Sequence, residues 1–448
     1  MSLKQINLFS QPTKVKINLE ENHELVRMEK IINWDELIEL AMNIRLSRIK
    51  AQTGPEPHYR ELLGAVVLMA VKKVTYRDAE DLIAHYAPAR YLCNLMESNW
   101  RIDHSTIFEF MKMMGPVGME KINSQIINIA VKEGFADPAE LMSDTTAQEA
   151  KIPYPNEVGL MSKYVNKVKT LIKKTGRKFS KVREKIKEVT KEVKGLVRTS
   201  HLFAKGKEQK RKVTKKLLHI VDDIHGLIQN EIQSGKRLTS KAGIELTKLT
   251  QIMDTLLTQI FYFTETGCVA AGKIIHLQMH QLYSIVRGKA GKKVEFGLKW
   301  GINRIKGGFI TGFLLNGGKH FSDKKFSIEA INHHINQFGS APETYGFDRG
   351  GYSRANIKKA KKLGVKHVGI APKGQDEWAV SETKKKYVMR ERAQVEGVIG
   401  TIKSPLYGFN KPNARSIKAM KNCGQRSFLG FNLKKLVREK RKLEFQAA

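Results

Sequence analysis

The chain has 448 residues, with 79 Lys and Arg against 44 Asp and Glu, so its formal net charge is +35. This length allows two or three domains, and so strong a positive charge predicts a polyanionic partner, with nucleic acid as the first candidate. The hydrophobic content of 41%, the short apolar runs and three distant cysteines exclude global disorder, a membrane protein, a secreted disulfide framework and a zinc finger.

The N-terminal part of the sequence predicts helices. Residues 1–55 are expected to form an arm and one helix, because apolar residues recur at helical spacing over 34–41. Residues 56–135 contain a strongly apolar helix around 62–71 and a short one over 107–114. Short helices with tight turns in a basic protein favour a helix-turn-helix-like DNA-binding domain. A plain helical bundle that does not touch DNA is the alternative.

A different pattern follows over residues 157–272. The stretch from 161 to 220 holds 21 Lys and Arg but only 4 Glu. Apolar residues recur there in steps of four and three, which predicts a helix with one apolar seam; they are Val182, Ile186, Val189, Val193 and Leu196. We expect a basic helical insertion, either a hairpin or a small bundle. Phosphate contact and a merely solvated charged surface are both compatible with such a face.

The spacing of apolar residues changes from helical to alternating at residue 294. Apolar and other residues alternate over 294–303, and Gly307-Gly308 then separates this strand from a second over 309–315, which predicts an antiparallel hairpin. The further expected elements are a strand over 140–142, a helix over 327–338, a strand over 344–347, a helix over 355–363, a strand over 366–371 and a helix over 384–402. Together they predict an α/β domain, a mixed sheet with flanking helices, built from residues 136–156 plus 273–435 and followed by a basic tail over 436–448.

Two aspartates follow predicted strands and are candidates for metal chemistry. Asp144 follows the strand at 140–142, and Asp348 follows the strand at 344–347. Carboxylates at strand ends can hold two magnesium ions about 4 Å apart for phosphoryl transfer. Taken singly, each is a weak signal, because an aspartate in such a place is more often a turn residue. A third acid would have to come from a helix, and the choice lies among Glu377, Glu382, Glu391 and Glu396.

Helical spacing favours Glu396 as the third acid. Arg392, Glu396, Ile399 and Lys403 follow one another in steps of four, three and four, so they share one face of the predicted helix. That stripe would set a carboxylate between two cations. A salt-bridge ladder on a solvated helix has the same spacing and is the alternative.

In these residues and their order, the chain resembles the DDE transposases of bacterial insertion sequences, in the group with a Tyr-Arg-Glu-Lys signature. That signature reads Y-x2-R-x3-E-x6-K, and Arg392, Glu396 and Lys403 fit its last three positions. Met389 stands at the tyrosine position, and Tyr387 is two residues early. The other segments that resemble this group are 59–110, 144–155, 287–289, 294–299 and 347–352.

The resemblance implies an RNase H-like core in which Asp144 lies on the first strand, Asp348 on the fourth and Glu396 on a C-terminal helix. These three residues would be both catalytic residues and metal ligands, for two Mg²⁺ ions that Mn²⁺ could replace. Arg392 and Lys403 would bind DNA phosphates. Lys289, Lys292 and Lys293 extend the expected DNA contact on their charge alone. The basic helical insertion would interrupt the core between its first two strands.

The implied function is cleavage of the ends of a mobile element and their joining to target DNA. The expected partners are double-stranded DNA, as terminal inverted repeats and target, and a second protomer, giving a homodimer on DNA. A bacterial cytoplasmic protein associated with the nucleoid is expected. Two alternatives stay open: a catalytically inactive DNA-binding remnant of a transposase, and an RNase H-like structure-specific nuclease that cuts without joining.

Overall fold

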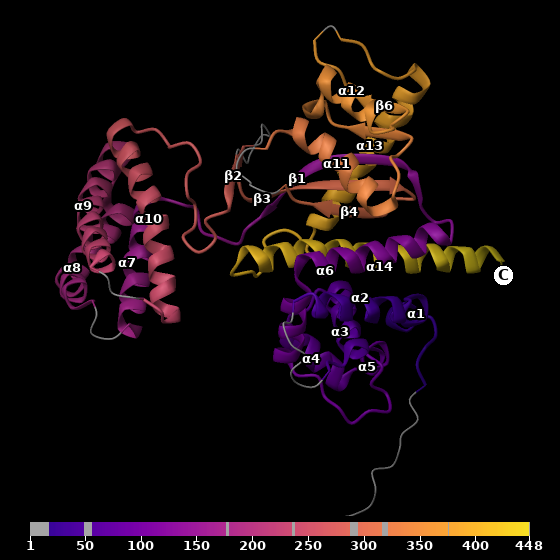
Figure 1. Cartoon of the computed structure of the whole chain (residues 1–448), viewed down its shortest axis with the longest axis horizontal. Coiled ribbons are helices and arrows are strands. Elements are labelled where there is room, and N and C mark those ends of the chain that lie inside the picture. The colour runs from indigo at the N-terminus through magenta and orange to yellow at the C-terminus, as the bar shows by residue number, and fades with distance from the viewer. Residues whose placement is uncertain are drawn as a thin grey trace, which may run out of the picture.

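The chain folds into N-terminal helices, a mixed sheet with helices on both faces, and a helical bundle inserted after the first strand (Figure 1). The computed structural model describes residues 18–48, 56–175, 179–234, 238–286, 294–315, 321–374 and 376–447. In Figure 1 the inserted bundle stands to the left, and helices α6 and α14 run between the sheet and helices α1 to α5. The mixed α/β class that the sequence predicts is confirmed.

The N-terminal helices are α1 (Glu24–Ile31), α2 (Trp34–Leu46), α3 (Tyr59–Lys72), α4 (Tyr76–His85), α5 (Ala87–Leu92) and α6 (His104–Lys132). The apolar run over 62–71 forms the buried α3. The predicted short helix over 107–114 is wrong in length, because α6 continues to Lys132. It bends at Gly115, whose φ of 61° suits glycine, and Pro116 has the fixed φ that a new helical turn accepts.

The sheet has the strands β1 (Asp137–Glu149), β2 (Tyr283–Val286), β3 (Val294–Lys306), β4 (Ile310–Phe313), β5 (Thr344–Phe347) and β6 (His367–Ile370). Their order is β2-β3-β1-β5-β6, with β4 also paired to β3. β3 is antiparallel to β1, β2 and β4, whereas β5 is parallel to β1 and to β6. The predicted β3–β4 hairpin is confirmed. The predicted strand over 140–142 is too short, because β3 pairs with β1 as far as Glu149.

Helices cover both faces of this sheet. The helices α11 (Asp323–Phe338) and α12 (Arg354–Lys362) pack on the face that carries Leu141 and Tyr345. The helix α13 (Glu382–Lys403) packs on the opposite face, which carries Met142. From Trp300 to Ile305, β3 is therefore buried on both sides despite its alternating sequence.

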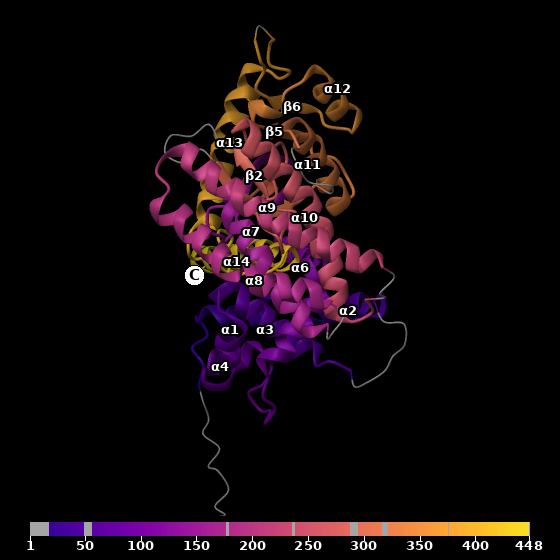
Figure 2. The same ribbon diagram turned by 90° about the vertical axis from the view of Figure 1, so that its left-hand side faces the viewer.

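The insertion is a four-helix bundle with its own apolar core, and it faces the viewer in Figure 2. Its helices are α7 (Glu157–Lys174), α8 (Ser180–Arg198), α9 (Gly206–Gln233) and α10 (Lys241–Thr266), with a π-turn over Thr199–Phe203. The predicted seam is confirmed, since its first four residues are buried on α8 and Leu196 is partly buried. Of the two predicted forms, the small bundle is the one found.

The last helix, α14 (Ile417–Ala447), joins the N-terminal helices to the sheet. Leu429, Leu433 and Leu436 pack into the same core as α3 and α6, and that core also includes Ile305 of β3. The sequence predicted a separate basic tail over 436–448. In the structure, residues 436–447 continue α14 instead. None of the helices in the described ranges combines the length and apolar character needed to cross a bilayer.

Candidate active site

Asp144 lies in β1, and Asp348 directly follows the neighbouring parallel strand β5. β1 and β5 pair in a register that sets Met142 opposite Gly346. The same register, continued two residues along both chains, brings Asp144 beside Asp348, which directly follows β5. Since side chains two residues apart share a face of a strand, both project from the Met142 face. Asp144 lies inside β1, not at its end as the sequence analysis expected.

Glycines on this face allow α13 to lie close to the sheet. A Cβ atom built on Gly346 or Gly369 would come within 2.8 Å of the Val388 side chain. Helical positions four and eight residues after Val388 fall on the same stripe, and these are Arg392 and Glu396. Close packing at Val388 therefore brings a cation and the third acid towards the two aspartates.

Arg392 links two of the three carboxylates. Its Nη1 donates to Oδ1 of Asp348 at 2.9 Å, and its Nη2 donates to Oε1 of Glu396 at 3.2 Å. The Arg392 side chain is 28% exposed, whereas Glu396 is 61% exposed. One guanidinium thus holds two carboxylates in front of the sheet, in the planar geometry that favours oxygen anions.

Asp144 is the least solvated of the three acids. Burial raises the pKa of its carboxyl from 3.8 to about 6, and the charges of Asp348 and Glu396 act in the same direction. The Thr145 backbone N–H, which donates to Oδ1 of Asp144 at 2.6 Å, and the Arg392 charge both act to lower this pKa. The site therefore concentrates negative charge beyond what its one guanidinium balances, which is a place where an added cation is favourable.

Thr145, Lys299 and Asp323 form a second polar group beside the site, on the other face of the sheet. The sequence did not predict it. The Thr145 hydroxyl donates to Oδ1 of Asp323 at 2.9 Å, and Lys299 Nζ lies 2.8 Å from the same oxygen. Asp323 opens α11, and its Oδ2 would be 2.7 Å from a Cβ on Gly350. The only local sign of a role for Asp323 was its position in a first helical turn. An acid there is explained equally well by its favourable interaction with the helix dipole.

The other acids considered for the third position have different partners. Glu391 forms a buried ion pair with Arg304 at 3.1 Å. Glu382 lies in the first turn of α13 and pairs with Lys385. Glu377 precedes the helix and is exposed. Only Glu396, among these four, shares a guanidinium with Asp348.

The remaining signature residues take structural partners. Lys403 Nζ lies 3.8 Å from Oε1 of Glu295, on β3. Tyr387 donates its hydroxyl to Glu140, while Met389 is exposed. The predicted DNA contacts at Lys289, Lys292 and Lys293 lie outside the described residues.

The chemistry of the three acids fits magnesium, which prefers oxygen ligands and keeps waters and phosphate oxygens in its shell. Their oxygens do not all lie within 4.8 Å of one another; among the described residues, Glu80, Asp103 and His104 are the group that meets this spacing. That cluster has structural roles, because Asp103 caps α6 and His104 pairs with Glu80 of α4 at 2.7 Å.

The comparisons with known proteins concern the N-terminal helices. Residues 14–113 match the model of the transposase domain family DUF772. No curated protein and no solved structure matched the chain. The matched segment includes α1 to α5 and the start of α6 but none of the three acids. This similarity indicates a transposase-like protein, and therefore a DNA-processing enzyme that binds DNA.

Proposed function

We propose that this protein is a DDE-type transposase that cuts the ends of a mobile element and joins them to target DNA. The observation that carries the proposal is the parallel register that brings Asp144 beside Asp348 on the face where α13 presents Glu396. The transposase-domain match of residues 14–113 supports it independently, since that segment contains none of these acids.

The strand arrangement also supports an RNase H-like core. If β2 is set aside as an added edge strand, Asp144 lies on the first strand, Asp348 follows the fourth, and Glu396 lies on a later helix. The bundle enters between the first strand and the next, so it lengthens the gap between the two aspartates without breaking the sheet. These are the positions that the family resemblance implies.

In this proposal, Asp144, Asp348 and Glu396 would hold two Mg²⁺ ions. Such ions, when bound, make water or a 3′-hydroxyl more nucleophilic and stabilise the leaving oxygen. In the cut, the oxygen of water bonds to phosphorus, the bond to the 3′ oxygen breaks, and that oxygen takes a proton. In the joining step, the freed 3′-hydroxyl attacks a target phosphodiester in the same way. No covalent protein–DNA bond is formed.

Arg392 has a defined role in this proposal. In the free protein it occupies one carboxylate oxygen each of Asp348 and Glu396. A guanidinium can exchange carboxylate partners for the phosphate oxygens of DNA, because both present the same paired geometry. Arg392 would thus neutralise the acids before DNA arrives and bind a phosphate afterwards. Two ends must be cut together, so we expect two protomers on the DNA.

The decisive experiment is an excision and joining assay on a plasmid that carries the gene's native flanking DNA, with Mg²⁺ or Mn²⁺ supplied. Asp348→Asn and Glu396→Gln should bind the DNA but neither cut nor join it. Glu382→Gln is the matched control, since it removes an acid from the exposed first turn of the same helix. Cutting without joining by the wild type would favour the nuclease, and binding without cutting would favour the inactive remnant.

A further inference from the structure

A groove of about 680 Å³ separates the N-terminal helices from the loop that connects α13 to α14. One wall comes from α3, α4 and α6, and the other from residues 408–426. Twenty residues line the groove; none is Asp or Glu, and five are basic, namely Lys73, Lys112, Lys411, Lys418 and Arg426. A hollow lined by charges of one sign concentrates ions of the opposite sign.

Few of these cations are neutralised by a nearby acid. Lys112 pairs with Glu109 at 2.8 Å, and Lys411 lies 4.0 Å from Glu149. Lys73 and Lys418 donate to backbone carbonyl oxygens. Arg426 has no carboxylate within salt-bridge distance in the described part of the chain. Burial raises the pKa of the nearby Tyr76 hydroxyl, and the Arg426 charge opposes that rise. The groove is therefore suited to a phosphate-bearing ligand.

The same groove exposes an aromatic side chain. Phe108 is 46% exposed, and its ring meets that of Tyr76 edge to face, with centroids 5.5 Å apart. Cations that follow a backbone, combined with an aromatic ring on which a base can stack, are the usual elements of single-strand nucleic-acid binding. An acidic peptide would use the cations but not the ring.

The groove is tied to the strand that carries Asp144. The Glu149 backbone N–H donates to Oδ1 of Asn410 at 2.9 Å, and the Lys411 N–H donates to the Glu149 carbonyl at 2.9 Å. Asn410 and Lys411 line the groove, while Asp144 precedes Glu149 by five residues on β1. That separation is about 17 Å along the strand, which a DNA strand covers in about five nucleotides at 3.4 Å each.

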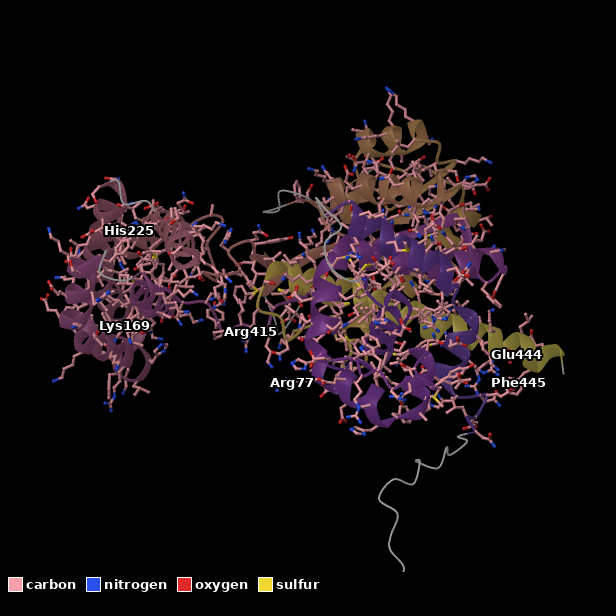
Figure 3. The ribbon with its side chains drawn as sticks, turned by 60° about the horizontal axis from the view of Figure 1, so that its bottom comes forward. Arg77, Lys169, His225, Arg415, Glu444 and Phe445 are labelled. Atoms are coloured by element: carbon pink, nitrogen blue, oxygen red, sulfur yellow. The ribbon has the colours of Figure 1, made fainter. Side chains whose placement is uncertain are left out.

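We propose that this groove holds one strand of DNA next to the cleavage site. Phosphates would contact Lys418 and Arg426, and an unpaired base would stack on Phe108. Arg77 and Arg415, which are both exposed and adjoin the lining residues Tyr76 and Ala414, extend the basic edge (Figure 3). The proposal rests on the proposed function for the identity of the polyanion as DNA.

The test uses the full chain and fluorescence anisotropy. The probes are a short duplex of the gene's flanking DNA, blunt or with a single-stranded overhang, titrated between about 50 and 200 mM salt. Lys418→Gln/Arg426→Gln should reduce the slope of log K against log salt by roughly 1.4, because each phosphate neutralised on a single strand contributes about 0.7. Phe108→Ala should leave the slope unchanged and weaken the overhang probe about tenfold more than the blunt one.

The matched control is Lys358→Gln/Lys359→Gln, which removes two exposed lysines from α12, at the far end of the sheet domain in Figure 1. If the groove and control variants have equal slopes, the groove proposal is overturned. Competition by polyglutamate as strong as that by DNA would assign the groove to an acidic protein instead. Cleavage is measured in parallel. If the wild type never cuts DNA but the groove variant still shows the smaller salt slope, the transposase proposal fails and the groove proposal stands.

Discussion

At the scale of single residues, the site is an excess of carboxylates held by one guanidinium. Asp348 and Glu396 both accept from Arg392, and Asp144 stands beside them with a burial-raised pKa. Such an arrangement costs stability when all three acids are ionised, because like charges in a partly desolvated place repel one another. A carboxylate cluster that lowers the stability of the fold is better explained by a role in catalysis than by a role in holding the fold together.

Replacing Asp144 with Asn should therefore stabilise the protein while it abolishes cutting. The folded carboxyl, with a pKa of about 6 against an ordinary value of 3.8, binds its proton more tightly than the unfolded one. Stability from this group is complete below about pH 4 and is lost as the pH rises through about 6, by roughly 2–3 kcal/mol in all. Urea titrations across this range measure it. A loss of stability at neutral pH in Asp144→Asn would contradict the explanation.

His334 should give the opposite pH dependence. Burial, and to a lesser degree the charge of His333, lower the pKa of His334 from 6.5 to about 4. The folded protein thus keeps this ring neutral where the unfolded chain binds a proton. Its contribution is complete above about pH 6.5 and is lost as the pH falls to about 4, by about 3 kcal/mol.

Denaturant titrations over the same range compare the wild type with His334→Gln and with His85→Gln, an exposed histidine. The acid-side fall in unfolding free energy should be shallower in His334→Gln and unchanged in His85→Gln. Equal slopes in all three proteins would exclude this role for His334.

At the scale of elements, the distance between α13 and the sheet decides whether the third acid reaches the site. A Cβ on Gly346 would lie 2.4 Å from Sδ of Met142 and 2.8 Å from Cγ1 of Val388. Both neighbours are buried, so neither can move aside freely. The helix would have to shift away, and Arg392 and Glu396 would move with it.

We expect Gly346→Ala to destabilise the protein by about 1–3 kcal/mol and to reduce cutting more than DNA binding. Gly397→Ala is the control on α13, because its Cβ would meet nothing within 4 Å. That change should stabilise the helix by about 0.5–1 kcal/mol. Thermal unfolding and the plasmid assay measure both effects. Full activity in Gly346→Ala would show that α13 does not need this close approach.

At the scale of the whole molecule, the chain has a separate core in the insertion and a larger one shared by the N-terminal helices and part of the sheet. The core of the bundle consists of residues between Val158 and Leu277. The shared core brings α3 and α6 together with α14, from the opposite end of the chain. The N-terminal helices are therefore fastened to the sheet, whereas the bundle has an apolar core of its own.

Calorimetry should therefore show two unfolding transitions that respond to different mutations. Leu246→Ala, in the core of α10, should lower only the transition of the bundle, and Leu429→Ala, in α14, only the other one. Both leucines are fully buried, so each change should cost about 2–5 kcal/mol. A single transition that shifts equally in both variants would mean that the two cores unfold as one.

Much of this architecture could be predicted where the signal is local. An apolar run located α3, apolar spacing located α8, alternation located β3, and Gly307-Gly308 marked the turn of the hairpin. The lengths of β1 and α14 could not be predicted in this way. β1 extends because β3 pairs along it, and α14 continues because Leu433 and Leu436 meet helices from the other end of the chain.

For the candidate site, the spacing of Arg392 and Glu396 was enough to set them on one stripe of a helix, because the helical repeat is a property of the backbone itself. Their meeting with Asp348, the neighbourhood of Asp144, and the Lys299–Asp323 pair depend on strand register and on how closely α13 packs. Those distances join residues far apart in the chain, and no local pattern encodes them. Composition and period thus determine the elements and the charge, while packing alone decides which acids and cations face one another.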